Sequence, residues 1–205
     1  MLVAEKNFEG CGGLVMTEEI QVTIAAQAGI LLLHREPDYY PDLYSILVYP
    51  RAFVAKGYAS LAPGYHLETE EVHLGESWRQ GALILSWDDV RAGAADIHDG
   101  HNVVFHEFAH QLDTEDGLAD GVPVLSGRSL YIAWARILSR EYEKLCEDKR
   151  RGRHSLLDQY GATNAAEFFA VATECFFEKP RQMQDKQPEL YEELKMFYRQ
   201  DPVHL

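Results

Sequence analysis

Residues 106–110, near the middle of the chain, read His-Glu-Phe-Ala-His and hold the residue types best suited to chemistry. Residues four apart on an α-helix lie one turn above another on the same face. The imidazoles of His106 and His110 could therefore converge on one zinc ion, with Glu107 beside them. A carboxylate in that place can take a proton from a metal-activated water, so the segment predicts metal-dependent hydrolysis.

This interpretation requires a helix over residues 100–113 with the imidazoles outside the core. Four apolar residues gather on one face of such a helix at about 100° per residue; they are Val104, Phe105, Phe108 and Leu112. Asp99 or Asn102 could cap its first turn. An accidental match is the alternative, because lone surface histidines are common. We expect the other seven to be of that kind: His34, His66, His73, His98, His101, His154 and His204.

A catalytic zinc needs a third protein ligand and an open position for water. Glu167 and Glu174 are the candidates, because they lie seven residues apart, two turns along one face of an expected helix, and border an apolar stripe. Each also has an ordinary interpretation. Glu167 fits a capping box with Asn164, and Glu174 could be a solvated residue. The residues alone leave the choice between the two open.

Two further residues near these segments have alternative roles. Cys175 could ligate zinc as a thiolate, but a small buried side chain is the favoured interpretation. Asp113 follows His110 by three residues and could accept a hydrogen bond from a ligand imidazole. It could equally be a carboxylate that ends the helix before the turn at 113–117.

The elements that must position these residues fall into two parts. Strands are predicted first and helices afterwards, which favours an α+β fold in one domain over 1–205, sheet-rich over 1–99 and helical over 100–205. The predicted strands are 44–49, 65–74 and 82–87, with a turn at 75–81. The predicted helices are 17–33 with Thr17 as N-cap, 100–113, 129–150, 164–178 stopped before Pro180, and 188–200, with a loop at 114–127.

Composition excludes some classes of function. The formal net charge of −14 repels phosphate, so direct nucleic-acid binding is not expected. The three cysteines are far apart and odd in number, which favours a reducing compartment over a disulfide framework. The start of the chain lacks the pattern of a signal peptide, and the apolar run 20–33 is too short and polar to span a bilayer. We therefore expect a cytoplasmic protein without a membrane partner.

Four segments of the chain resemble the Mlc titration factor A family of bacterial zinc peptidases: 75–87, 102–113, 121–123 and 158–177. The resemblance implies a zincin-like fold, a small mixed sheet with an edge strand over the cleft, and a helical second half. In that family the third zinc ligand is the Glu of the Ala-Glu-x-Phe-Ala-Val segment, which is Glu167 here. Glu174 would then orient a ligand imidazole from behind.

The family is also similar to the catalytic domain of anthrax lethal factor. A tyrosine seven residues before the ligand Glu faces the metal there, and Tyr160 stands at that spacing here. The resemblance implies that Tyr160 donates a hydrogen bond to the oxyanion; a core tyrosine is the alternative. Relatives usually carry a further N-terminal helical stretch, and this chain starts near what would be the end of it. The resemblance therefore does not carry over any regulation by that stretch.

The function predicted on these grounds is a zinc-dependent, aminopeptidase-like peptidase. Zn²⁺ would be held by His106, His110 and Glu167, with Glu107 as general base, and a peptide substrate would pair with strand 82–87 as the edge strand. The alternative is a regulatory protein that sequesters a transcriptional repressor of sugar uptake, with weak or vestigial peptidase activity, as the family name implies.

Overall fold

A computed structural model describes residues 2–35, 40–51, 53–62, 65–73, 75–78 and 81–204, with backbone only for the strands between 53 and 78. Its strands are β1 (Asn7–Gly10), β2 (Ser45–Tyr49), β3 (Phe53–Ala62), β4 (Tyr65–His73), β5 (Gly75–Trp78) and β6 (Ala82–Ser86). Its α-helices are α1 (Leu2–Glu5), α2 (Glu18–Ile30), α3 (Trp87–Ala95), α4 (Val103–Asp113), α5 (Arg128–Arg150), α6 (Ala165–Glu178), α7 (Pro180–Lys186) and α8 (Pro188–Tyr198). Short 3₁₀ turns are η1 (Thr114–Asp116), η2 (Gln159–Ala162) and η3 (Pro202–His204). The α+β fold is zincin-like, with a helical second half, as predicted.

The main sheet has the strand order β1-β2-β6-β5. β1, β2 and β6 are parallel, and β5 runs antiparallel to β6. Ile46 of β2 lies beside Leu83 of β6, and both side chains are fully buried. Such burial is typical of the apolar central strands of a sheet that helices cover.

The prediction that strand 82–87 is the edge of the sheet is wrong. β6 lies between β2 and β5, and the edge on that side is β5, in the stretch predicted to be a turn. β5 reads Gly-Glu-Ser-Trp and has no alternation of apolar and polar residues, so only its backbone pairing with β6 reveals it. Gly81, directly before β6, has a left-handed φ of 76°.

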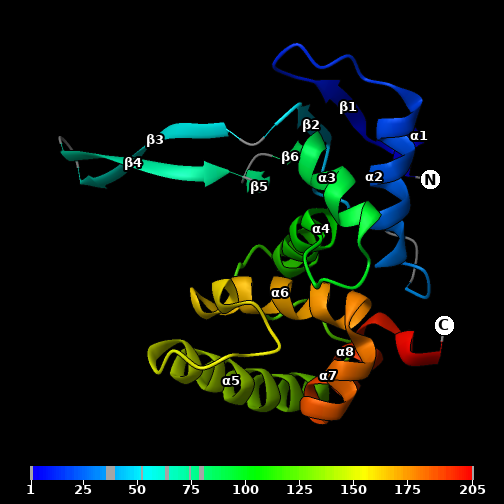
Figure 1. Ribbon diagram of the computed structural model, residues 1–205, viewed down its shortest axis with the longest axis vertical. Coiled ribbons are helices and arrows are strands. Elements are labelled where there is room, and N and C mark those ends of the chain that lie inside the picture. The colour runs from blue at the N-terminus through cyan, green and yellow to red at the C-terminus, as the bar shows by residue number, and fades with distance from the viewer. Residues whose placement is uncertain are drawn as a thin grey trace.

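β3 and β4 form an antiparallel hairpin that extends away from the helices (Figure 1). The strand predicted at 65–74 is β4, whereas β3 was not predicted. In Figure 1 the sheet lies near the top with α2 and α3 beside it, α4 lies below, and α6 separates α4 from α5, α7 and α8. α4 therefore packs against α6 and also contacts β5, the edge of the sheet.

The predicted helices are present, with small changes at their ends. Thr17 caps α2 by accepting a hydrogen bond from the Ile20 amide, as expected, but the helix ends at Ile30 instead of residue 33. Pro180 does end α6, but it also begins α7, which was not predicted. Proline suits the first turn of a helix because the missing N–H has no partner there.

One core cluster joins the two parts of the chain. Phe108 of α4, Phe169 and Phe176 of α6, and Tyr198 of α8 are all fully buried within it. In the part of the chain that the structure describes, no helix is long and apolar enough to cross a membrane. Burial of α4 and α6 from several sides fixes the two helices that carry the candidate site.

Candidate metal centre

Helix α4 presents the two histidines of the 106–110 segment from one turn to the next. Its buried face holds Val104, Phe108 and Leu112, all fully inaccessible to solvent. Asn102 caps the helix, as one of the two predicted candidates. On the other side the rings of His106 and His110 lie 4.9 Å apart, with their Nε2 atoms separated by 3.3 Å. The predicted helix thus brings two imidazole nitrogens together at one point.

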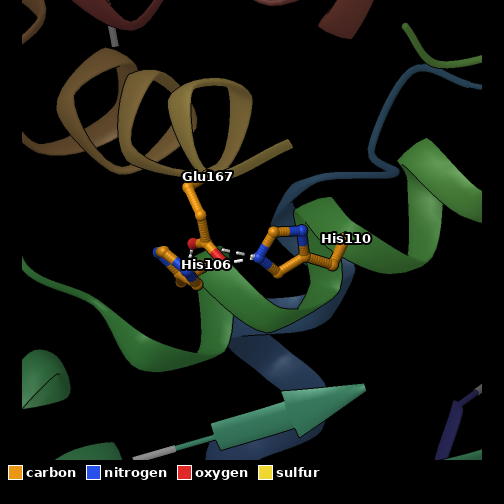
Figure 2. Close-up of side chains that lie close together, drawn as sticks. All are labelled: His106, His110 and Glu167. Carbon is orange, nitrogen blue, oxygen red and sulfur yellow. Dashed lines mark hydrogen bonds and ion pairs between the residues drawn. The ribbon is translucent and has the colours of Figure 1, made fainter. Parts of the chain in front are cut away.

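Helix α6 brings a carboxylate to the same point. Asn164 caps α6 by accepting a hydrogen bond from the Glu167 amide, as the capping-box interpretation expects. The Glu167 side chain, however, reaches the imidazoles: its Oε2 lies 2.9 Å from Nε2 of His106 and 3.4 Å from Nε2 of His110. Figure 2 shows Glu167 descending from its own helix onto the two rings of the neighbouring helix.

These three side chains could hold a metal ion. One donor atom from each of His106, His110 and Glu167 lies within 4.8 Å of the others, and each side chain is partly accessible. If Nδ1 of His106 carries the ring proton, Nε2 directs a lone pair at a carboxylate and at a second imidazole nitrogen. A cation among these electron-rich atoms would relieve their repulsion, and two imidazoles with one carboxylate are a donor set that suits zinc.

The electrostatics of the three groups agree with this arrangement. Burial lowers the pKa of His106, but hydrogen bonds with Glu167 and Glu174 outweigh it and raise that pKa to about 10. Burial raises the pKa of Glu167, but hydrogen bonds with His106 and His110 bring it down to about 2. Positive charge is therefore favoured among these side chains, whether a proton or a metal supplies it.

Glu107 lies next to this cluster in a buried position. It is 5% exposed, and within the described residues its Oε2 has no hydrogen-bond partner. Burial raises the pKa of its carboxyl to about 7, against the opposing charges of His106 and His110. An acid with a pKa near neutrality can accept and release a proton at physiological pH.

Glu174 meets the opposite side of His106. Its Oε1 lies 2.7 Å from Nδ1 of His106, and its Oε2 accepts a hydrogen bond of 2.6 Å from the Asn102 amide. The two acids that the sequence left as alternatives thus face different ring nitrogens, Glu167 toward Nε2 and Glu174 toward Nδ1. The carboxylate at Nδ1 fixes the ring orientation and the tautomer.

Tyr160 lies beside the cluster. It belongs to η2, just before α6, and its ring centroid is 6.0 Å from that of His106. The side chain is 54% exposed, which excludes the alternative of a core tyrosine. Tyr160 is therefore a surface residue next to the imidazole of His106.

Asp113 has the second of its two predicted roles. Its Oδ2 accepts a hydrogen bond of 3.0 Å from the Gly121 amide, and no hydrogen bond joins it to an imidazole among the residues that the structure describes. The expectation that it orients His110 by such a bond is therefore not met. The carboxylate instead holds the loop after α4, whose Gly121 carbonyl also accepts from Trp134 Nε1 at 2.9 Å.

Other residues near the site have roles that the sequence did not reveal. Gln27 and Glu178 are buried and bond to Asn102, behind Glu174. The signal for Glu178 was its spacing of four from Glu174 on one helical face. Cys175 is the buried apolar side chain that was expected, and burial raises the pKa of its thiol to about 12, so it does not supply a thiolate.

Comparison with known proteins matches nearly the whole chain. The sequence profile of the glucose-regulated metallo-peptidase M90 family matches residues 1–199. An uncharacterized protein of Synechocystis sp. is 44% identical over 205 residues, which are 99% of this chain and 74% of that protein. Proteins named Mlc titration factor A from Yersinia pestis and Yersinia pseudotuberculosis are 30% identical over 205 residues, which are 98% of this chain and 75% of theirs. The matches span both the sheet and the helices that carry the metal-ligating cluster.

Proposed function

Because the chain belongs to the glucose-regulated metallo-peptidase M90 family, we propose that it is a zinc-dependent peptidase with aminopeptidase-like action. The observation that carries the proposal is the convergence of His106, His110 and Glu167 on one point, with the buried acid Glu107 beside them. Zinc is the metal proposed, although iron or cobalt can also occupy a site of two imidazoles and one carboxylate.

In the proposed reaction, His106, His110 and Glu167 hold the metal. When bound, zinc would lower the pKa of a water molecule toward neutrality and polarise the carbonyl of the scissile bond. Each of the three ligands is partly exposed, which supports access of solvent to the cluster. Water and substrate would reach the metal through this exposed part of the cluster.

Glu107 is the proposed general base. Its carboxyl, with a pKa raised to about 7 by burial, would take a proton from the attacking water and pass it to the leaving amine. Since Oε2 has no other partner among the described residues, it is available for that proton. Tyr160 would donate its hydroxyl proton to the oxyanion of the tetrahedral intermediate, which its exposed place beside His106 permits.

The peptide substrate would pair with β5 in this proposal. β5 is the outer strand of the sheet next to β6, and it contacts α4, the helix with both histidines. An extended peptide added to that edge would satisfy the outward-facing backbone groups by β-augmentation and run alongside the metal cluster.

The three cysteines are free thiols, which supports the cytoplasm as the place of action.

The substitution Glu107→Gln tests this proposal. It keeps the size of the side chain but cannot accept the proton, so zinc content should stay at one ion per chain while hydrolysis of an aminopeptide substrate vanishes. Glu143→Gln, at an exposed position on α5, is the matched control and should retain full activity. Zinc is measured by elemental analysis, and cleavage is followed before and after chelation. Full activity in Glu107→Gln would refute the proposed role of Glu107, and a wild-type protein that binds no metal would refute the site.

A regulatory function is the second candidate, favoured by the Yersinia relatives named Mlc titration factor A. In that case the chain would bind and sequester a transcriptional repressor of sugar uptake, with weak or vestigial peptidase activity. The same variant separates the two functions. A regulator would retain repressor binding in Glu107→Gln, and the wild-type protein would cleave peptides slowly or not at all.

A further inference from the structure

Asn102 has more hydrogen bonds than its place at the start of a helix requires. The residue is 2% exposed, and its Oδ1 accepts from the Val104 and Phe105 amides at 3.1 Å each, which caps α4. Capping needs only an acceptor, so serine, threonine or aspartate would serve as well. The cap therefore does not explain why an amide side chain stands there.

The side-chain amide of Asn102 donates in two directions. Nδ2 lies 2.8 Å from Oε1 of Gln27 on α2 and 3.1 Å from Oε1 of Glu178 on α6. Asparagine can accept through its oxygen and donate twice through its nitrogen, whereas aspartate cannot donate and serine can donate only once. All of the hydrogen-bonding capacity of this side chain is used, and it joins three helices.

The backbone of the same segment meets the two carboxylates of α6. The Asn102 amide donates to Glu174 at 2.6 Å, and the Gly100 amide donates to Oε2 of Glu178 at 3.0 Å. The other oxygen of Glu174 holds Nδ1 of His106 at 2.7 Å. A continuous chain of hydrogen bonds thus runs from Gln27 through Asn102 and Glu174 to the imidazole.

Every member of this chain behind His106 is buried, with exposed fractions between 2% for Asn102 and 8% for Gln27. Hydrogen bonds to a carboxylate in such surroundings are short and strong, and they permit little displacement of the groups that they join. Since His106 comes from α4 and Glu167 from α6, the position of one helix on the other decides whether the ligands meet.

We propose that Asn102 is a positioning residue of the metal site, which holds α4 in register with α6 and presents Glu174 to His106 in a fixed orientation. The inference rests on the proposed function, because it treats His106 and Glu167 as ligands. Asn102 touches neither the metal position nor the substrate and acts only through Glu174 and the placement of the two helices.

Two substitutions remove hydrogen bonds of the Asn102 side-chain amide and still leave α4 with a capping residue. Asn102→Ser keeps a capping oxygen and loses the two amide donors, and Gln27→Met removes one of the partners without touching the cap. We expect the zinc dissociation constant to rise roughly 10- to 100-fold in Asn102→Ser, and by a smaller factor in Gln27→Met, as for other residues that orient metal ligands. Thr17→Ala is the control, because it removes the cap of α2 and lowers the melting temperature without contact to this chain of hydrogen bonds.

The measurements are zinc affinity by competition with a chromogenic chelator, and exchange of the His106 imidazole N–H proton that faces Glu174, followed by NMR in metal-free protein. That proton should exchange faster in Asn102→Ser than in the wild type and remain unchanged in Thr17→Ala. Wild-type affinity and exchange in both Asn102→Ser and Gln27→Met would overturn the proposal, as would an equal loss of affinity in Thr17→Ala. A wild-type protein that binds no zinc would overturn the proposed function, while the exchange measurement would still decide the role of Asn102.

Discussion

The buried carboxyl of Glu178 should make the stability of the protein depend on pH in a way that one substitution removes. Its side chain is 3% exposed and accepts hydrogen bonds from Gly100 and Asn102. Burial raises the pKa of Glu178 from 4.5 to about 7, against the hydrogen bond from Asn102, and the nearby charges of Asp99 and Glu174 add to the rise. The folded state thus favours the protonated form of Glu178. The contribution of Glu178 to the unfolding free energy is fully present below pH 4.5 and is lost as the pH rises through about 7.

The size of this effect follows from the two pKa values. Each pH unit between them is worth roughly 1.4 kcal/mol, so ionisation of Glu178 should remove about 3 kcal/mol of unfolding free energy between pH 4.5 and pH 8. Glu178→Gln removes the titration but leaves an amide N–H opposed to a donor, which costs about 1–3 kcal/mol at every pH. The test therefore compares how steeply the unfolding free energy changes with pH in the two proteins, and not its value at one pH.

Urea unfolding followed by circular dichroism, in the presence of chelator, measures this slope from pH 4.5 to pH 8. The wild type should lose about 3 kcal/mol more than Glu178→Gln over this range, because the other titrating groups are common to both and cancel. Glu143→Gln, which removes an exposed carboxylate from α5, should follow the wild type. Parallel curves for the wild type and Glu178→Gln would refute the reasoning.

Two further predictions concern the loop after α4 and the metal. Gly121→Ala should destabilise the fold by about 2 kcal/mol more than Gly117→Ala, because a Cβ on Gly121 would lie 2.4 Å from the Ala165 carbonyl oxygen, whereas Gly117 has nothing within 4 Å and shares the left-handed φ. Equal losses in urea unfolding would contradict this. Zinc at about 100 times its dissociation constant should stabilise the fold by about 2.7 kcal/mol, or roughly 5–10 °C in melting temperature, and chelation should reverse the change. A melting temperature that zinc does not alter would count against the proposed site.

The helices of the site could be predicted from the sequence because their signals are local. Residues 102–113 and 164–178 each combine a capping asparagine with apolar residues at helical spacing, and both helices form where these signals stand. β5 carries no such signal, since its backbone pairing with β6 and not its residue types makes it a strand. The edge of the sheet was consequently assigned to the wrong strand.

The third member of the cluster could not be deduced from residue types. Glu167 and Glu174 lie on one face of the same helix, and each borders the same apolar stripe. What separates them is the position of α6 on α4, which brings Glu167 to Nε2 and Glu174 to Nδ1 of the same ring. Such a position depends on contacts between residues more than sixty apart in the chain, which periodicity does not report.

Helix α6 shows how far this position determines chemistry. Glu167 meets two imidazoles, and Glu174 meets one imidazole and a backbone amide. Glu178, the third acid of this helix, accepts from a pair of amide donors. The pKa of the first is lowered to about 2 and that of the last is raised to about 7, although the residue type and the helix are the same. A shift of α6 by two turns, about 10 Å along its axis, would put Glu174 in the place of Glu167. The register of the two helices therefore defines the site as much as the 106–110 segment does, and the proposal for Asn102, whose amide donates to Glu174 of α6, tests what holds that register.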